Sequence, residues 1–280
     1  MQGERCYVSV KESLAAVAGF ALLLFYVAVL LLGSFTPPAD LVVFALGVLA
    51  TLALHEGIHV AVAYAFGARG ISVKPFRASW ILVGVYVSTK TSLRRDEWLV
   101  VALAPLLVLT PAALVAAKTL EGLARETAEF IVVFNTMGAG GDLFLALAVL
   151  LSAKRDALIH DEGERVVFEG SCSRVAALTS IGKAVLAFSA TFCCLWLGVL
   201  ALCAFLRLDV EALGVRLIET EKAAGYAARL TNAGLATFLA VALIAALLVG
   251  LAEYKKLGRM GEASAKAGEK KDNFSATASS

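Results

Sequence analysis

The sequence predicts an all-α polytopic membrane protein with about six transmembrane helices and a small β-rich insertion at the membrane surface. Of the 280 residues, 60% are hydrophobic, and the mean hydropathy is +0.82, whereas soluble domains are about half apolar. The apolar residues form runs that reach the roughly 20 residues needed to cross a hydrocarbon core. Because backbone groups in lipid must satisfy their own hydrogen bonds, these runs are expected to be helices.

The predicted spans cover approximately residues 13–34, 41–66, 97–117, 129–151, 183–206 and 231–252. The first run follows Lys11 and could be mistaken for a secretion signal. It is longer than a signal core, however, and no clear small-x-small cleavage site follows it before Pro37. This run is therefore interpreted as a retained span.

Basic residues are concentrated between the second and third spans, between the fourth and fifth, and after the sixth. The positive-inside rule places these segments and both termini on the cytoplasmic side of the cell membrane. The connection 207–230, which is also basic, fits this orientation less well. The net charge of +2 does not indicate a nucleic-acid partner, so the expected partners are the lipid bilayer and a membrane-protein or peptide substrate.

Residues 70–91 interrupt the helical pattern between the second and third spans. They are rich in Val, Ile, Trp and Tyr and contain Pro75 and Gly84. This composition is typical of a β-hairpin or a sheet-like insertion at the membrane surface. The alternative is a short interfacial segment anchored by Trp80 and Tyr86.

The second span contains the sequence HEGIH at residues 55–59, which includes two of the three histidines of the chain. Residues four apart share a helix face, so the imidazoles of His55 and His59 can bind one zinc ion. Glu56 is then placed to act as general base on a zinc-activated water. Ionisable residues inside a span are costly and usually mark function. A buried polar cluster that only holds helices together is the alternative.

Catalytic zinc sites usually have three protein ligands, and the fourth span offers Asp142 as the third. Counted from the outer membrane surface, His55 and His59 lie about 14 and 18 residues into their span, and Asp142 lies about 13 residues into its own. At 1.5 Å per residue, these depths agree to within about two helical turns. The three side chains are predicted to converge in the cytoplasmic half of the bilayer.

Asn135 precedes Asp142 by seven residues, which places both on the same face of the fourth span. Asn135 is predicted to be catalytic, as a hydrogen-bond donor to a developing oxyanion or to the substrate backbone. A polar contact between helices is the alternative role. The glycines 138, 140 and 141 could bring the fourth span against the second, or loosen the helix locally.

The remaining chemical candidates are assigned structural roles. His160 lies among acidic residues and is interpreted as a surface residue, with an auxiliary role near the substrate as the alternative. Pro105 is interpreted as bending or packing the third span. No CxxC pair is present, and the three cysteines of the fifth span are interpreted as packing residues. The cysteines are Cys6, Cys172, Cys193, Cys194 and Cys203.

The sequences HEGIH and NTMGAGGD resemble the motifs of site-2 protease-type intramembrane metalloproteases, and more closely those of the putative zincin peptidase family of small prokaryotic membrane proteins. The similarity covers roughly residues 40–170. The resemblance implies that His55, His59 and Asp142 bind zinc and that Glu56 is catalytic.

In site-2 proteases, the insertion near 70–90 would form a sheet that presents the substrate as an added strand, and this sequence is compatible with that arrangement. The chain also departs from the site-2 pattern. Asp142 follows glycines and precedes Leu143, where that pattern has prolines and an Asp-Gly pair, and the chain has no PDZ-like domain.

The sequence thus predicts an intramembrane zinc-dependent endopeptidase. Its alternatives are a membrane metal transporter or metal-binding protein, and a non-catalytic scaffold of the same fold. A transporter needs a series of ligands along its path, which the spans hardly offer, and an intact Glu56 argues against a scaffold. The predicted divisions are an N-terminal helix at 1–35, a metalloprotease core at 36–170, a pair of spans at 171–254 and a disordered basic cytoplasmic tail at 255–280.

Overall fold

The structure is a computed structural model. It describes residues 4–33, 35, 40–78, 81–162, 165–199, 210–212, 215–221, 227–230 and 236–253. Within these residues, five helices are long and apolar enough to cross a membrane, or six if a bent helix pair forms one span. The predicted class, a mostly helical membrane protein with small antiparallel sheets, is confirmed. The chain divides into two units, Met1–Leu186 and Ala187–Ser280, which are described separately.

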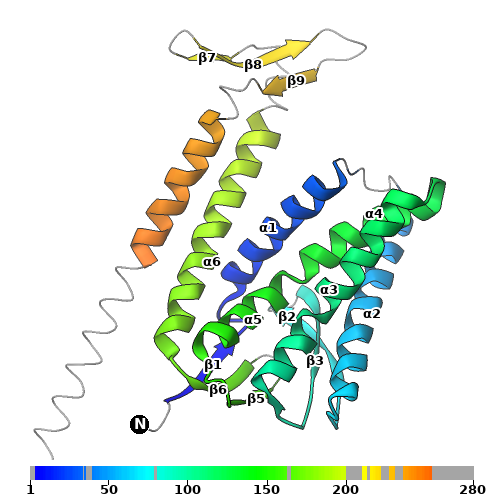
Figure 1. The fold of residues 1–280 in the computed structure, drawn as a ribbon. Coiled ribbons are helices and arrows are strands. Elements are labelled where there is room, and N and C mark those ends of the chain that lie inside the picture. Colours follow the sequence, from blue (N-terminus) through cyan, green and yellow to red (C-terminus); the bar gives the residue numbers. More distant parts are fainter. Residues whose placement is uncertain are drawn as a thin grey trace, which may run out of the picture. The chain divides into compact units, whose positions relative to one another are not determined.

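The first unit is a helix bundle with a sheet at one end (Figure 1). Its helices are α1 (Leu14–Leu32), α2 (Leu41–Ala65), α3 (Arg95–Thr119), α4 (Gly122–Gly138), α5 (Gly140–Ser152) and the larger part of α6 (Cys172–Cys193). The start of α2 is fixed by Asp40, whose Oδ1 accepts hydrogen bonds from the backbone N–H groups of Val42 and Val43. Helix α6 begins at Cys172, earlier than the predicted residue 183.

The predicted fourth span is broken into α4 and α5, which are bent by 40° at Ala139. Of the three glycines suggested to approach the second span, Gly140 and Gly141 lie against α1 instead, and a Cβ atom on Gly138 would meet nothing within 4 Å. A Cβ atom on Gly140 would lie 2.5 Å from the Cα atom of Ala21 on α1. Gly140 therefore lets α5 approach α1, and the bend places Asp142 in the first turn of a new helix.

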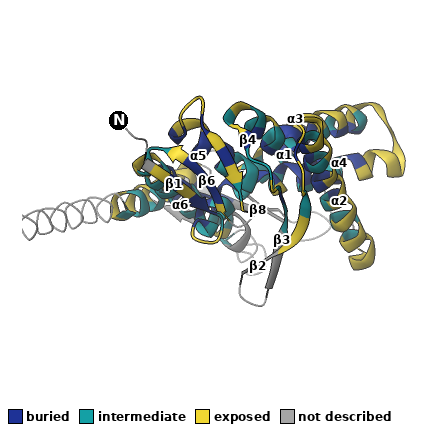
Figure 2. Cartoon of the chain, turned by 90° about the horizontal axis from the view of Figure 1, so that it is seen from below, coloured by how far each residue is buried: buried dark blue, intermediate teal, exposed yellow. Residues whose placement is uncertain are grey.

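The outer surface of the bundle is apolar. On α2, six large apolar side chains are more than half exposed: Leu41, Val42, Val43, Leu46, Leu49 and Tyr64. Burial is instead concentrated where the helices meet each other and the sheet (Figure 2). Apolar faces of this kind contact lipid when the helices span a bilayer.

The predicted insertion is a two-stranded antiparallel hairpin formed by β2 (Ser72–Ala78) and β3 (Ile81–Ser88). The strand interpretation is therefore confirmed. The hydroxyl oxygens of Ser72 and Ser88 are 2.9 Å apart across the open end of the hairpin. Trp80, the proposed interfacial anchor, lies outside the described residues.

A second, four-stranded antiparallel sheet was not predicted. Its order is β1 (Glu4–Ser9), β6 (Arg165–Gly170), β5 (Leu158–Asp161) and β4 (Leu93–Arg94). In β1, Cys6 and Val8 are buried while Arg5 and Tyr7 are exposed, as expected for a strand with one face on a core. In β6, the three consecutive residues 166–168 are all buried. The buried face of the sheet packs against the ends of α3 and α5 and forms one core with them.

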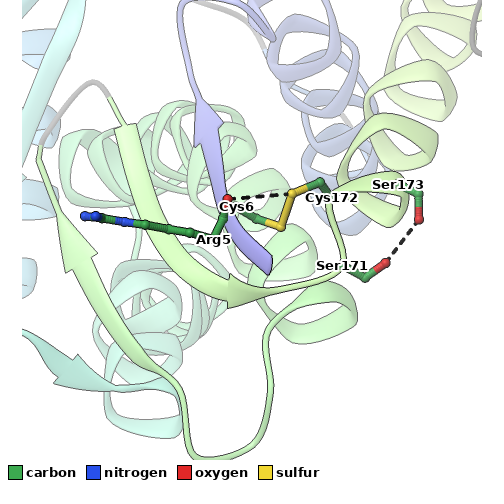
Figure 3. Close-up of a disulfide and its surroundings, with 5 residues drawn as sticks. All are labelled: Arg5, Cys6, Ser171, Cys172 and Ser173. Carbon is green, nitrogen blue, oxygen red and sulfur yellow. Dashed lines mark hydrogen bonds between the residues drawn. A yellow bond between two sulfur atoms is a disulfide. The ribbon is translucent and has the colours of Figure 1, made fainter. Parts of the chain in front are cut away.

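Cys6 and Cys172 form a disulfide that joins β1 to the start of α6 (Figure 3). The two residues are separated by 166 positions in the sequence, and their Cα atoms are 5.3 Å apart. Disulfides persist mainly in oxidising compartments, whereas the basic loops favour the cytoplasm for the same end of the bundle. The predicted orientation therefore stays a prediction.

The second unit begins within α6, which continues as the π-helix η1 (Cys194–Val199). Three short strands follow, β7 (Val210–Ala212), β8 (Val215–Glu221) and β9 (Ala227–Leu230), and form an antiparallel sheet within the predicted connection 207–230. The helix Ala236–Glu253 is long and apolar enough to be a span. The predicted tail at 255–280 and Cys203 lie outside the described residues.

Candidate metal centre

The predicted metal ligands meet at one point inside the first unit. Helix α2 supplies His55 and His59, both buried, and the first turn of α5 supplies Asp142. The two Nε2 atoms are 3.2 Å apart. Asp142 Oδ2 is 3.0 Å from Nε2 of His55 and 3.5 Å from Nε2 of His59. Within the described part of the chain, no other three His, Cys, Asp or Glu residues gather in this way.

These distances fit a tetrahedral zinc ion. Zinc binds His nitrogen and carboxylate oxygen at about 2.0–2.2 Å, so neighbouring ligand atoms of a tetrahedral site lie about 3.3–3.5 Å apart. The observed separations are 3.0, 3.2 and 3.5 Å, so one lies in this range and the other two are shorter by about 0.1–0.3 Å. Two imidazoles and one carboxylate also leave a fourth position for water, as catalytic zinc sites require.

Both imidazoles are fixed through their second nitrogen. Nδ1 of His55 donates to Oδ1 of Asn135 at 2.9 Å, and Nδ1 of His59 donates to the carbonyl of Val101 at 2.8 Å. Carbonyl oxygens only accept hydrogen bonds, so in the neutral imidazole the proton lies on Nδ1 and the Nε2 lone pair is available to a metal. Such outer partners are typical of histidine ligands.

Asn135 is 1% exposed, and its amide is engaged on both sides. Its Nδ2 donates to the carbonyl of Pro105 at 3.0 Å and to the hydroxyl of Thr110 at 2.8 Å, while its Oδ1 accepts from His55. Both amide protons are thus used within the bundle. These contacts favour a positioning role for Asn135, and its predicted role as an oxyanion donor stays a prediction.

We expect Asn135→Ala to weaken zinc binding by about 10–100-fold, the usual effect of removing an outer partner of a metal ligand. The comparison variant is Thr136→Val, because Thr136 contacts the hydroxyl of Thr110 at 3.0 Å and is therefore connected to His55 only through Thr110 and Asn135. Zinc affinity is measured by competition with a chromophoric chelator. Equal losses in the two variants would contradict a specific effect on His55.

Glu56 lies beside the metal ligands and is 9% exposed. Among the described residues, its Oε2 atom has no hydrogen-bond partner. A buried carboxylate oxygen without a partner is unfavourable, and such an atom in a native site calls for an explanation such as a bound water or substrate. The position of Glu56 therefore fits a proton acceptor that works on a molecule in the cavity.

A cavity of about 500 Å³ contains this site. His55, Glu56, His59 and Asp142 line it, together with apolar side chains of α1 and the β3 segment 85–87. The first span, whose role the sequence left open, thus forms one wall. The indole of Trp98, also on the wall, donates to Oδ2 of Asp161 at 3.4 Å.

His160 does not line this cavity, although its neighbour Asp161 does. It is exposed on β5, where its ring contacts the hydroxyl of Ser92 at 2.9 Å. The described residues that line the metal-site cavity do not include His160. The surface interpretation therefore agrees with its position.

Comparison with known protein families supports the same chemistry. Residues 48–158 match the model of the family described as putative zincin peptidase. The matched segment includes the three candidate metal ligands, Glu56 and Asn135. No curated protein and no solved structure matches the chain. The match supports a metal-dependent peptidase. It does not test the resemblance to site-2 proteases.

Sequence reasoning missed two partners of the site. The carbonyl of Val101 is a backbone group, and Thr110 is one of many threonines in apolar helices. One signal was present: Pro105 lies four residues after Val101 and removes a helical hydrogen-bond donor.

Proposed function

We propose that this protein is an intramembrane zinc-dependent endopeptidase that hydrolyses peptide bonds of membrane proteins or membrane-bound peptides. One observation carries the proposal. The Nε2 atoms of His55 and His59 and Oδ2 of Asp142 lie within 3.5 Å of one another, and an unpartnered oxygen of Glu56 lies in the same cavity.

The residues take separate roles. His55, His59 and Asp142 would hold the zinc ion, which when bound supplies a Lewis acid that makes water a nucleophile near neutral pH. Glu56 Oε2 accepts the proton that the water loses and returns it to the leaving amine. Asn135 and the Val101 carbonyl keep the two imidazoles oriented throughout.

The hairpin offers a place for the substrate. In the described part of the chain, β3 pairs only with β2, and its segment 85–87 lines the cavity. An extended peptide added along β3 would bring its carbonyl groups toward Glu56. A helical substrate hides its carbonyls in its own hydrogen bonds, so a transmembrane segment must unwind locally before it is cut.

The test measures bound zinc and cleavage in the full-length protein purified in detergent. We expect about one zinc per chain. Removing the metal with a chelator should abolish cleavage of a membrane-anchored reporter, and adding zinc should restore it. Absence of stoichiometric zinc would contradict the proposal. Zinc flux into proteoliposomes without any cleavage would instead support the transporter.

A further inference from the structure

We propose that Pro105 is a positioning residue of the metal centre, because its missing N–H leaves the carbonyl of Val101 free to hold His59. This inference rests on the proposed zinc site. It gives a specific chemical role to a proline that the sequence suggested only bends or packs the third span.

The first step is the hydrogen-bond pattern of α3. In an α-helix, each carbonyl accepts the N–H of the residue four positions later. Pro105 has no N–H, and its ring crowds the carbonyl of residue 101. Val101 O therefore lacks its helical donor. The donor it receives is Nδ1 of His59, at 2.8 Å.

The second step is the effect on the imidazole. Since a carbonyl only accepts, the bond requires the proton of His59 to be on Nδ1. In the neutral imidazole that a metal requires, Nε2 is then the free nitrogen, and it lies 3.5 Å from Asp142 Oδ2 and 3.2 Å from Nε2 of His55. Alanine at position 105 would restore a donor that competes with His59 for the Val101 carbonyl.

The third step connects the same proline to the other histidine. The carbonyl of Pro105 accepts from Nδ2 of Asn135 at 3.0 Å, and Oδ1 of Asn135 accepts from Nδ1 of His55 at 2.9 Å. One turn of α3 thus supports both imidazoles. The side chain of Pro105 is fully buried, so this turn faces the bundle and not the lipid.

Helix α3 also offers a control for the substitution of Pro105. Pro111 is the second proline inside α3, and it removes the helical donor to the carbonyl of Leu107. Leu107 is 65% exposed and Pro111 is also exposed, so both lie on the outer face of the bundle, whereas Thr110 in the same turn is buried and bonded to Asn135. Replacing Pro111 by alanine changes the same helix in the same chemical way, about one and a half turns from Pro105, and alters no residue that contacts an imidazole.

The experiment compares Pro105→Ala with Pro111→Ala in the full-length protein in detergent. Zinc affinity is measured by competition with a chromophoric chelator, and ligand geometry by the d–d absorption of bound Co²⁺. We expect Pro105→Ala to bind zinc about 10–100-fold more weakly, the usual effect of losing an outer partner, and to change the Co²⁺ spectrum. Pro111→Ala should match wild type in both.

A third variant separates the missing N–H from the shape of the ring. Lactic acid at position 105 has an ester oxygen in place of the N–H and has no ring. We expect it to retain wild-type zinc affinity, even if Pro105→Ala does not fold. Wild-type affinity in Pro105→Ala, or weak binding in the lactic acid variant, would overturn the inference. A wild-type protein that binds no zinc overturns the proposed function instead.

Discussion

Glu56→Gln should reduce cleavage by about 10²–10⁴-fold, the range that a positioned general base contributes. Glutamine keeps the shape of the side chain but cannot accept the proton at Oε2. His55, His59 and Asp142 are unchanged, so the zinc content should stay at the wild-type value. Reporter cleavage and metal analysis of the same preparation give both quantities.

The control for Glu56→Gln is Glu129→Gln. Glu129 is bonded to Arg125 one turn earlier on α4, at 2.8 Å, and does not line the cavity among the residues described there. This change should leave cleavage at the wild-type rate. Cleavage that survives in Glu56→Gln would remove Glu56 from the mechanism, whatever the zinc content.

Asp142→Asn should lose the metal itself, whereas Glu56→Gln should lose cleavage and keep the metal. The carboxylate supplies the single negative charge among the three ligands, and a neutral amide is a poorer zinc ligand. We expect zinc affinity to fall by more than the about 10–100-fold caused by loss of an outer partner. Cleavage should fall with it and recover in part at high zinc concentration.

Asp161→Asn is the matched control for Asp142→Asn. Asp161 lies on the wall of the same cavity, but its carboxylate accepts from the indole of Trp98 and is not part of the three-residue group. Its zinc affinity should equal that of wild type. If Asp142→Asn binds zinc as tightly as wild type, the third ligand lies elsewhere.

The two variants together separate the parts of the site. Glu56→Gln with zinc retained and Asp142→Asn with zinc lost would assign proton transfer to α2 and completion of the metal site to α5. A shared loss of zinc would mean that Glu56 supports the metal, and the general base would then have to be sought among other groups of the cavity.

Local periodicity explains how much of the site could be predicted from the sequence. A spacing of four residues on a continuous helix places His55 and His59 on one face, whatever surrounds them. Counting residues from the membrane surface brought Asp142 to nearly the same depth, and the structure places its Oδ2 3.0 Å from His55. Depth works here because the bilayer fixes where each span begins.

The four-stranded sheet could not be predicted in the same way. Its strands are short, and β1, near the start of the first unit in the sequence, pairs with β6, near its end. Cys6 and Cys172 are brought together by that pairing, and no spacing rule connects residues 166 positions apart. Pairings over such distances depend on the whole packing of the unit.

The sequence by itself determined the membrane class, the HEGIH helix and the choice of Asp142 as its partner, because helix period and bilayer thickness are local constraints. Only the tertiary structure decided what holds the imidazoles. Asn135 turns its amide toward His55, and the Val101 carbonyl turns toward His59 because Pro105 removes its helical donor. Every residue has a backbone carbonyl, so the sequence does not show which side chain will bond to it. This part of the site therefore follows from how α2, α3 and α4 pack.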